Sequence, residues 1–190
     1  TLEPDEGSIY FEKENIKNLD VASRCRKGIA RSFQIPQPFS GMTVLENALV
    51  SATQGGKLKI GNAQEFCVHI LEITGLLPKA NRLAGELTLL ERKRLELAKA
   101  LATKPKILLL DEIAGGLTDQ ECQVLILTIK NIMKEDITII WIEHVVHALL
   151  SVVQKLLVLD FGEKVAEGNP AEIMKSKTVQ KIYLGIDADG

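Results

Sequence analysis

One apolar run that ends in two acidic residues constrains the fold of this chain more than any other segment. Residues 107–110 are Ile-Leu-Leu-Leu, and Asp111 and Glu112 follow directly. Four apolar residues in a row predict a strand buried on both faces, as in the centre of a parallel sheet. Ligands bind at the carboxyl ends of such strands, where a pair of carboxylates is costly unless it holds a metal or moves protons. The simpler alternative, a strand end followed by a helix cap, stays open on this segment alone.

The residues after Pro105 alternate between strand and helix patterns, as in βαβ units. The expected elements are strand 106–110, helix 119–134, strand 137–142, helix 145–153 and strand 155–160. The apolar runs at 137–142 and 156–159 are both expected to be buried parallel strands. A hairpin should follow, with its turn at 161–164, and two short helices are expected at 170–175 and 177–184.

The residues before Pro105 are dominated by helix patterns. The first expected elements are strand 8–11, helix 18–27 and strand 29–34. Thr43 and Glu46 have the spacing of a capping box, which predicts that a helix begins there and runs to about residue 53. Further helices are expected at 63–74 and 89–102, the second with a basic face that the simplest interpretation leaves in solvent. The sequence therefore predicts an α/β fold interrupted by a helical insertion at about 43–100.

Composition sets limits on the class of protein. The chain has 190 residues, of which 46% are hydrophobic and 25% charged, with a formal net charge of −2. These values are ordinary for a globular domain and give no electrostatic reason to expect nucleic-acid binding. No apolar stretch approaches the ~20 residues of a membrane-spanning helix, and the first residues do not resemble a signal peptide. Cys25, Cys67 and Cys122 lack metal-type spacing, so reduced intracellular thiols are expected.

Four further features accompany the acidic pair. Gln34 closes a predicted strand just ahead of the helical insertion, and the segment 87–91 opens the basic helix. Glycines within 115–119 allow a tight loop after the acids, before a helix that Thr118 or the residue after it can cap. His144 ends the next strand, so it should lie at the same edge of the sheet as the acids. Each feature alone has a simpler structural explanation, but their combination favours a site.

In this order the motifs resemble those of the ATP-binding subunits of ABC transporters, over essentially the whole chain. The correspondence is Gln34 to the Q-loop, 87–91 to the signature segment, Asp111 and Glu112 to the Walker B motif and catalytic base, 115–119 to the D-loop, and His144 to the switch histidine. Within this family the amino-acid sequence most resembles that of importers of branched-chain amino acids. The segments that carry this resemblance are 28–34, 42–47, 94–102, 142–144 and 183–185. The resemblance implies a P-loop NTPase-like fold, with a mostly parallel sheet, flanking helices and an all-helical subdomain.

The resemblance also implies roles for individual residues, with ATP and Mg²⁺ as cofactors. Asp111 would hold the Mg²⁺ of the nucleotide, and Gln34 would sense that ion and the attacking water. Glu112 would polarise this water, and His144 would contact the γ-phosphate. Thr88 would offer its hydroxyl to the γ-phosphate of ATP bound by a second ATP-binding subunit. The implied activity is ATP hydrolysis coupled to solute import.

The same resemblance divides the chain into three parts and suggests its partners. Residues 1–42 would hold the first strands and the Q-loop, 43–102 the helical subdomain with the signature segment, and 103–190 the α/β core with the remaining motifs. The implied partners are integral-membrane permease subunits, a second ATP-binding subunit and, indirectly, a solute-binding protein, with no nucleic acid. The chain would then lie on the inner face of the cell membrane, held there by the permease.

The sequence departs from the family pattern at two motifs. No Gly-x-x-x-x-Gly-Lys-Ser/Thr occurs, and the only Gly-Lys pair, at 56–57, is followed by Leu58. The family places that loop just before a segment like 1–7, so an N-terminally truncated or incompletely predicted sequence is expected, and a chain that is inactive alone. In the signature segment Leu90 replaces a glycine, and Glu91 introduces a carboxylate near the expected anion. Ile113 and Thr118 are milder departures.

Two alternatives stay open. The chain could be a degenerate ABC subunit without catalysis, kept as a scaffold that docks to a permease. It could also serve an importer of urea or another amide, because only the sequence similarity of a few segments favours branched-chain amino acids. The DNA-repair and chromosome-associated ABC ATPases lack support, since there is no basic stripe, coiled-coil insertion or zinc motif.

Overall fold

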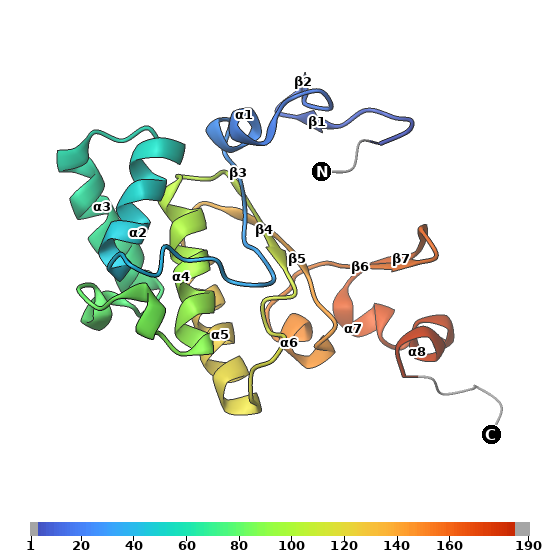
Figure 1. The fold of residues 1–190 in the computed structure, drawn as a ribbon. Coiled ribbons are helices and arrows are strands. Elements are labelled where there is room, and N and C mark those ends of the chain that lie inside the picture. The colour runs from blue at the N-terminus through green and yellow to red at the C-terminus, as the bar shows by residue number, and fades with distance from the viewer. Residues whose placement is uncertain (1–3, 185–190) are drawn as a thin grey trace. The chain divides into compact units, whose positions relative to one another are not determined.

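A parallel sheet forms the framework of the first of two compact units into which the chain divides. The computed structural model describes residues 4–184, and the units are Thr1–His144 and Val145–Gly190 (Figure 1). In the first unit β3 (Ile29–Arg31), β4 (Ile107–Asp111) and β5 (Thr138–Ile142) pair in the order β3-β4-β5. Both pairings are parallel, as expected for an α/β fold. The division into 1–42, 43–102 and 103–190 that the family resemblance implies stays a prediction.

The sheet is less buried than the apolar runs predicted. In β4 the side chains of Leu108 and Leu110 are fully buried, whereas their neighbours in the strand are half-buried. In β5 Ile140 is exposed, and Ile142 keeps 64% of its surface accessible. The prediction of a strand at 137–142 buried on both faces is therefore wrong. Because side chains alternate between faces along a strand, this pattern means that the described residues cover one face of the sheet and leave the other open.

The helical insertion agrees with the sequence prediction in position and in its caps. Its elements are α2 (Val44–Val50), the π-helical turn η1 (Ser51–Gly55), α3 (Ile60–Ile73), the short 3₁₀ turns η2 (Leu77–Lys79) and η3 (Ala84–Glu86), and α4 (Leu89–Ala102). The predicted capping box is present, because the Glu46 amide donates to Thr43 Oγ1 at 3.2 Å and the Glu46 carboxylate accepts from the Thr43 amide. Helix α5 (Asp119–Ile132) then connects β4 to β5 and is capped by Thr118.

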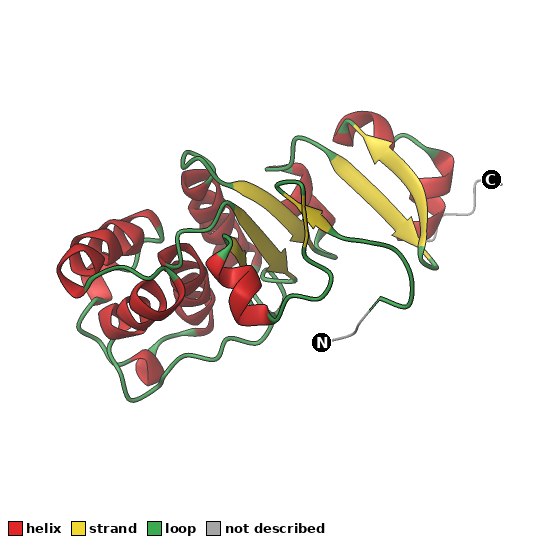
Figure 2. Ribbon diagram, turned by 90° about the horizontal axis from the view of Figure 1, so that it is seen from above, coloured by secondary structure: helices red, strands yellow, loops and turns green. Residues whose placement is uncertain are grey.

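The interior of the first unit lies between these helices and the sheet. Figure 1 shows α4 and α5 running along one side of the strands, and Figure 2 gives the same arrangement from above. The largest fully buried apolar side chains include Leu71, Leu95, Leu97, Leu101, Leu125 and Ile129. The expectation that the basic face of the helix at 89–102 is solvated is wrong in part, since Lys93 and Glu96 are buried. Near Glu96, Lys99 provides a compensating charge at 2.8 Å.

The first described elements are a small hairpin and a helix. Strands β1 (Tyr10–Phe11) and β2 (Glu14–Asn15) pair antiparallel, and α1 (Val21–Arg26) follows. The strand expected at 8–11 is shorter than predicted, and β2 was not predicted because Glu-Asn has low strand propensity. Asp20 caps α1 by accepting the Ser23 amide at 2.5 Å, and the hydrogen bonds from Ser23 lower the pKa of the Asp20 carboxyl.

The second unit contains a hairpin where the sequence suggested a third parallel strand. Strand β6 (Leu156–Asp160) pairs antiparallel with β7 (Glu163–Gly168), so the prediction of a buried parallel strand at 156–159 is wrong, while the predicted hairpin is confirmed. The two-residue turn Phe161-Gly162 has positive φ at both positions, as in the turns that suit twisted hairpins. The described helices of this unit are α6 (Val146–Leu150), α7 (Pro170–Ile173) and α8 (Lys177–Leu184).

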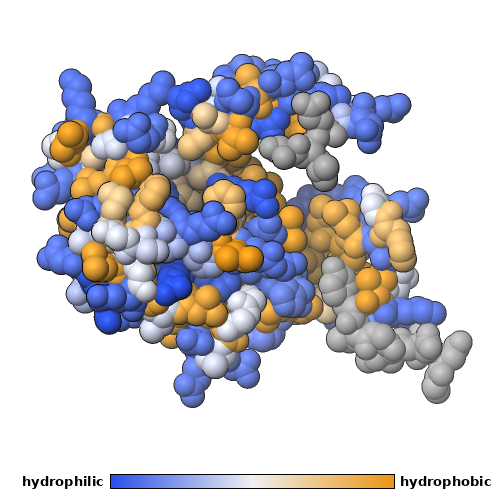
Figure 3. Space-filling model, viewed as in Figure 1, coloured by the Kyte–Doolittle hydropathy of each residue, from blue (hydrophilic) through white to orange (hydrophobic). Residues whose placement is uncertain are grey.

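Two further features of the structure are the distribution of apolar side chains on the surface and the state of the three cysteines. On the side drawn in Figure 3, apolar side chains are scattered among polar ones. Cys25, Cys67 and Cys122 form no disulfide among the described residues, and burial raises the pKa of Cys67 to about 11. Within residues 4–184 no helix is both long enough and apolar enough to cross a membrane.

Candidate functional site

The carboxylate of Asp111 lies at the C-terminal end of β4, at the centre of the three-stranded sheet. The register places Asp111 beside Ile142 of β5. On its other side Arg31, the last residue of β3, brings Nη2 to 2.6 Å from Asp111 Oδ2. No sequence pattern selects Arg31, because its position beside Asp111 depends on the pairing of β3 with β4. The strand end therefore carries an ion pair rather than a lone acid.

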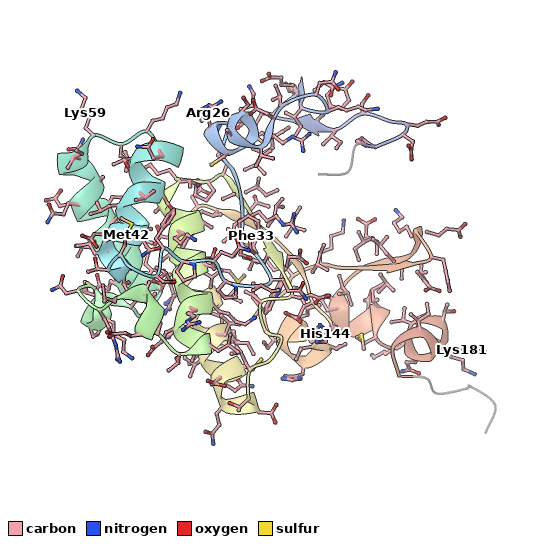
Figure 4. All side chains as sticks on the ribbon, viewed as in Figure 1. Arg26, Phe33, Met42, Lys59, His144 and Lys181 are labelled. Carbon is pink, nitrogen blue, oxygen red and sulfur yellow. The ribbon has the colours of Figure 1, made fainter. Side chains whose placement is uncertain are left out.

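The carboxylate of Glu112 is the point where residues from all three strand ends meet. Gln34, in the loop after β3, donates from Nε2 to Glu112 Oε2 at 2.5 Å. His144, just after β5, has its Nδ1 3.9 Å from the same oxygen. Figure 4 shows His144 at this end of the strands, with Phe33 in the segment that leads to Gln34. Two residues that are distant in sequence, Gln34 and His144, thus approach the same carboxylate oxygen of Glu112.

The backbone after Glu112 turns sharply and brings the following loop close to His144. Glu112 has a φ of 44°, in the left-handed region that non-glycine residues seldom adopt, at a cost of roughly 1–2 kcal/mol. Its amide donates to the Ile142 carbonyl at 2.9 Å, which ties this turn to the end of β5. A Cβ placed on Gly115 would lie 3.4 Å from the Glu112 carbonyl oxygen and 3.7 Å from His144 Cε1. Both would be ordinary van der Waals contacts, so this loop lies against the histidine without requiring glycine at position 115.

The buried carboxylate of Glu143 accepts hydrogen bonds from two backbone amides next to the site. Its Oε2 accepts the amide of Ala114 at 2.9 Å, and its Oε1 accepts the amide of His144 at 3.1 Å. His144 Nδ1 is 3.3 Å from Glu143 Oε1. Glu143 therefore fixes both the loop after Glu112 and the start of the segment that carries the histidine. The sequence analysis did not select Glu143, although its place directly before His144 was a signal.

Helix α4 contributes a buried cation to the same region. Lys93 is only 4% exposed. Burial lowers the pKa of the Lys93 amino group, and the negative charge of Glu143 acts in the opposite direction. A buried charge is costly unless an opposite charge lies near it, so the favourable Coulombic interaction with Glu143 offsets part of the cost of burying Lys93. The basic residues of α4 thus have an internal role that their pattern did not reveal.

Thr88 has a structural role at the start of α4. Its Oγ1 accepts the Glu91 amide at 3.4 Å, and its own amide donates to Glu91 Oε2 at 3.0 Å. Glu91 also pairs with Lys79. Burial opposes ionisation of Glu91, but the hydrogen bonds from Lys79 and Thr88 outweigh it and lower the pKa of the carboxyl. No contact within residues 4–184 joins Thr88 to the acidic pair or to His144.

We expect Thr88→Ala to lower the free energy of unfolding by about 1 kcal/mol, because an N-cap hydroxyl is lost from a long buried helix. Urea unfolding followed by circular dichroism measures the change. Thr88→Ser is the matched control, since it keeps the hydroxyl and should cost much less. An equal loss in both variants would show that the methyl group, and not the cap, is responsible.

The site offers few ligands for a permanently bound metal. Among the described residues, no group of three or more His, Cys, Asp or Glu side chains is arranged to hold a metal ion. Asp111 supplies one carboxylate, which is paired with Arg31. Gln34, in the loop after the neighbouring strand β3, supplies an amide oxygen. Mg²⁺ is often bound by one or two carboxylates together with substrate phosphates and water. The residues therefore fit an ion that arrives with a nucleotide.

Comparison with known proteins supports the resemblance found in the motifs. The family model described as ABC transporter matches residues 1–115. The high-affinity branched-chain amino acid transport ATP-binding protein BraF of Pseudomonas aeruginosa is 33% identical over 198 residues, covering 96% of this chain and 78% of BraF. A probable branched-chain amino acid transport ATP-binding protein, LivG of Methanocaldococcus jannaschii, is 32% identical, covering 97% of this chain and 78% of that protein.

Solved structures agree in fold as well as in sequence. The ADP conformation of an ATP-binding cassette of an ABC transporter superposes with a TM-score of 0.84 at 31% identity, covering 97% of this chain and 79% of the other. A nucleotide-free ATP-binding cassette from an ABC transporter gives a TM-score of 0.82 at 30% identity, with the same coverage. The predicted P-loop NTPase-like fold and the predicted family are both confirmed. The chain is therefore a member of the ABC transporter family and corresponds to its ATP-binding cassette, an ATPase by family.

Proposed function

We propose that this chain is the ATP-binding subunit of an importer for branched-chain amino acids, and that it couples ATP hydrolysis to transport. The observation that carries the proposal is the meeting of Gln34 and His144 at one oxygen of Glu112. The names of BraF and LivG supply the solute class. ATP hydrolysis needs a positioned water and compensation of charge on the phosphates, and the strand ends carry side chains suited to both.

Each residue at the strand ends has a separate proposed task. Glu112 accepts a hydrogen bond from the attacking water and thereby orients it. Gln34 holds the Glu112 carboxylate through Nε2, which leaves its Oε1 to face water or the ion. His144 is directed to the terminal phosphate as a hydrogen-bond donor, held by Glu143 on its other side. Asp111 is the residue to hold Mg²⁺, which neutralises charge on the phosphates when a nucleotide is bound.

Arg31 is proposed to compensate the charge of the Asp111 carboxylate while no nucleotide is bound. The ion pair between Arg31 and Asp111 satisfies a charge that would otherwise stand alone at the strand end. Binding of a nucleotide with its ion would compete with this contact, because Arg31 and the ion are both attracted to the Asp111 carboxylate. Release of Arg31 would place a guanidinium next to the incoming phosphates, where its charge is favourable.

The proposed partners are permease subunits in the membrane and a second ATP-binding subunit. Around Gln34, the side chains of Phe33, Ile35 and Phe39 are exposed, and apolar side chains at such a position suit contact with a partner. Contact there would transmit a change at Gln34 to the permease and keep the chain at the inner face of the membrane. Thr88 is proposed to reach the ATP held by the second subunit. The Glu91 charge, which is paired with Lys79, would then repel that anion less than an unpaired carboxylate.

We expect a polypeptide of these 190 residues to bind ATP weakly or not at all, because the sequence holds no Gly-x-x-x-x-Gly-Lys-Ser/Thr loop to cradle the phosphates. Titration calorimetry with ATP and Mg²⁺ measures this directly. The matched comparison is the same polypeptide preceded by a P-loop segment of the family, which should bind. Micromolar binding by the 190 residues alone would contradict the expectation.

A scaffold without catalysis is the second candidate function. It is favoured by Leu90 and Glu91 in the signature segment, where the family has a glycine and a neutral side chain. The two candidates differ in one measurement. Hydrolysis of ATP by the complete transporter should fall when Glu112 is altered if the chain is catalytic, and should stay unchanged if it is a scaffold. Uptake of labelled leucine or urea by the same complex separates the two solute classes.

A further inference from the structure

A small basic pocket lies at the opposite end of the sheet from the acidic pair. It forms where β3 and β4 begin, and there the Gly28 carbonyl accepts the amides of Lys106 and Ile107 at 2.8 and 3.0 Å. Its walls come from the ends of α1, η1 and α4 and from the residue before β4, and they enclose about 170 Å³. Figure 4 shows Arg26 at this end of the sheet and His144 at the other. The pocket is thus separate from the proposed ATP site.

The walls of this pocket carry a surplus of positive charge. None of the lining residues is acidic, and half of them are basic, namely Arg26, Lys27, Lys57, Lys104 and Lys106. Lys27 pairs with Glu14 at 2.5 Å, and Lys106 pairs with Glu12 at 2.6 Å. The other three cations have no carboxylate within ion-pair distance among residues 4–184. Lys104 instead lies 5.0 Å from the centre of the Phe66 ring.

Helix ends explain part of this charge but not all of it. Three helical segments, α1, η1 and α4, end at the pocket, and cations near helix C-termini stabilise the exposed carbonyl groups. Each C-terminus is equivalent to about half a negative charge, so three ends offset at most about one and a half of the unpaired cations. Both α1 and η1 are also short, which weakens their dipoles. More than one positive charge therefore stays uncompensated.

Two of the cations occupy backbone positions where glycine is favoured. Lys57 follows the C-cap of η1, and Lys104 follows the C-cap of α4. Their φ values of 53° and 56° lie in the left-handed region, which suits glycine at the residue after a helix C-cap. Glycine would therefore serve the backbone better at both positions. The lysine side chains stand there despite that cost, which favours a role for their charge.

We propose that this pocket binds a small phosphate-bearing anion of about diphosphate size. The volume is about five or six times the ~30 Å³ that a water molecule takes in the liquid, which is room for one or two phosphate groups. The backbone amides of Gly28 and Lys104 already donate to the carbonyls of Cys25 and Leu101. Side-chain cations are therefore the groups left to bind the anion, as charge-assisted donors.

Cys25 offers a direct reporter for occupancy of the pocket. It lines the pocket and is half-buried, whereas Cys67 and Cys122 are buried in the interior. The rate at which a neutral thiol reagent labels Cys25, read by mass spectrometry of the peptide, should fall several-fold in saturable fashion as pyrophosphate is added. Sodium chloride at equal ionic strength should give no such protection, because it only screens charge. Calorimetric titration of pyrophosphate without Mg²⁺ or ATP provides a second readout.

Variants test whether the cations carry the binding. Lys57→Gln with Lys104→Gln should abolish protection and the heat of binding. The charge-matched control is Lys59→Gln with Lys130→Gln, which alters two exposed lysines outside the pocket and should leave both signals unchanged. Vesicles that contain phosphatidic acid distinguish a lipid headgroup from a free anion as the natural source. Absence of saturable protection by both pyrophosphate and vesicles, or equal loss in the two double variants, would overturn the proposal.

Discussion

Glu112→Gln is expected to reduce ATP hydrolysis by the complete transporter about 10²–10⁴-fold, the range for loss of a general base. The amide keeps the size of the side chain and can still pair with Gln34, but it cannot take a proton from water. Nucleotide binding should change little, since Glu112 is not among the residues proposed to hold the phosphates. Steady-state phosphate release gives the hydrolysis rate, and binding of a fluorescent ATP analogue gives the affinity.

The matched control for this variant is Glu72→Gln, because Glu72 is an exposed carboxylate on α3, away from the three strand ends. It should leave hydrolysis unchanged. A fall of less than about threefold in Glu112→Gln would contradict the proposed role and favour the scaffold. A parallel fall in ATP affinity and in hydrolysis would instead mean that the substitution disturbs the loop that Glu112 begins.

Features that depend on neighbouring residues could be predicted from the sequence. The three capping boxes at Thr43, Thr88 and Thr118 join residues three apart, so the pattern of hydroxyl and glutamate contains all the information that the geometry needs. Only the box at Thr43 was predicted as such, whereas the bounds of α4 agree with a prediction from its apolar spacing. The parallel order of β4 and β5 also followed from the intervening helix, because parallel strands need such a crossover.

Features that depend on distant residues could not be predicted in this way. The contact of Arg31 with Asp111 spans 80 positions and exists only because β3 lies beside β4. The run at 156–159 has the same composition as a buried strand, and only its partner, the hairpin strand β7, decides how it is used. Gln34 and His144 were selected as members of a motif, yet their meeting at one oxygen of Glu112 needs the strand order.

The pair formed by Lys93 and Glu143 shows most clearly how such distant contacts support the site. We expect Lys93→Met to lower the free energy of unfolding by about 0.5–3 kcal/mol, the range for residues that interact, because the buried Glu143 carboxylate loses a favourable Coulombic interaction. Methionine fills nearly the same volume, so the loss would arise from charge and not from a cavity. Urea denaturation measures it, with the exposed Lys130→Met as a control that should change stability by no more than about 0.5 kcal/mol.

A double-mutant cycle then separates the charge from packing. Glu143→Gln alone should also destabilise the fold, because it leaves Lys93 buried without its counter-charge and weakens the support of His144. The double variant should be more stable than the sum of the two losses predicts, by about 0.5–3 kcal/mol, the range found for residues that interact. Additive losses would show that the two side chains do not compensate each other. Since Glu143 accepts the amides of Ala114 and His144 at 2.9 and 3.1 Å, coupling would also mean that α4 stabilises the proposed site through its buried lysine.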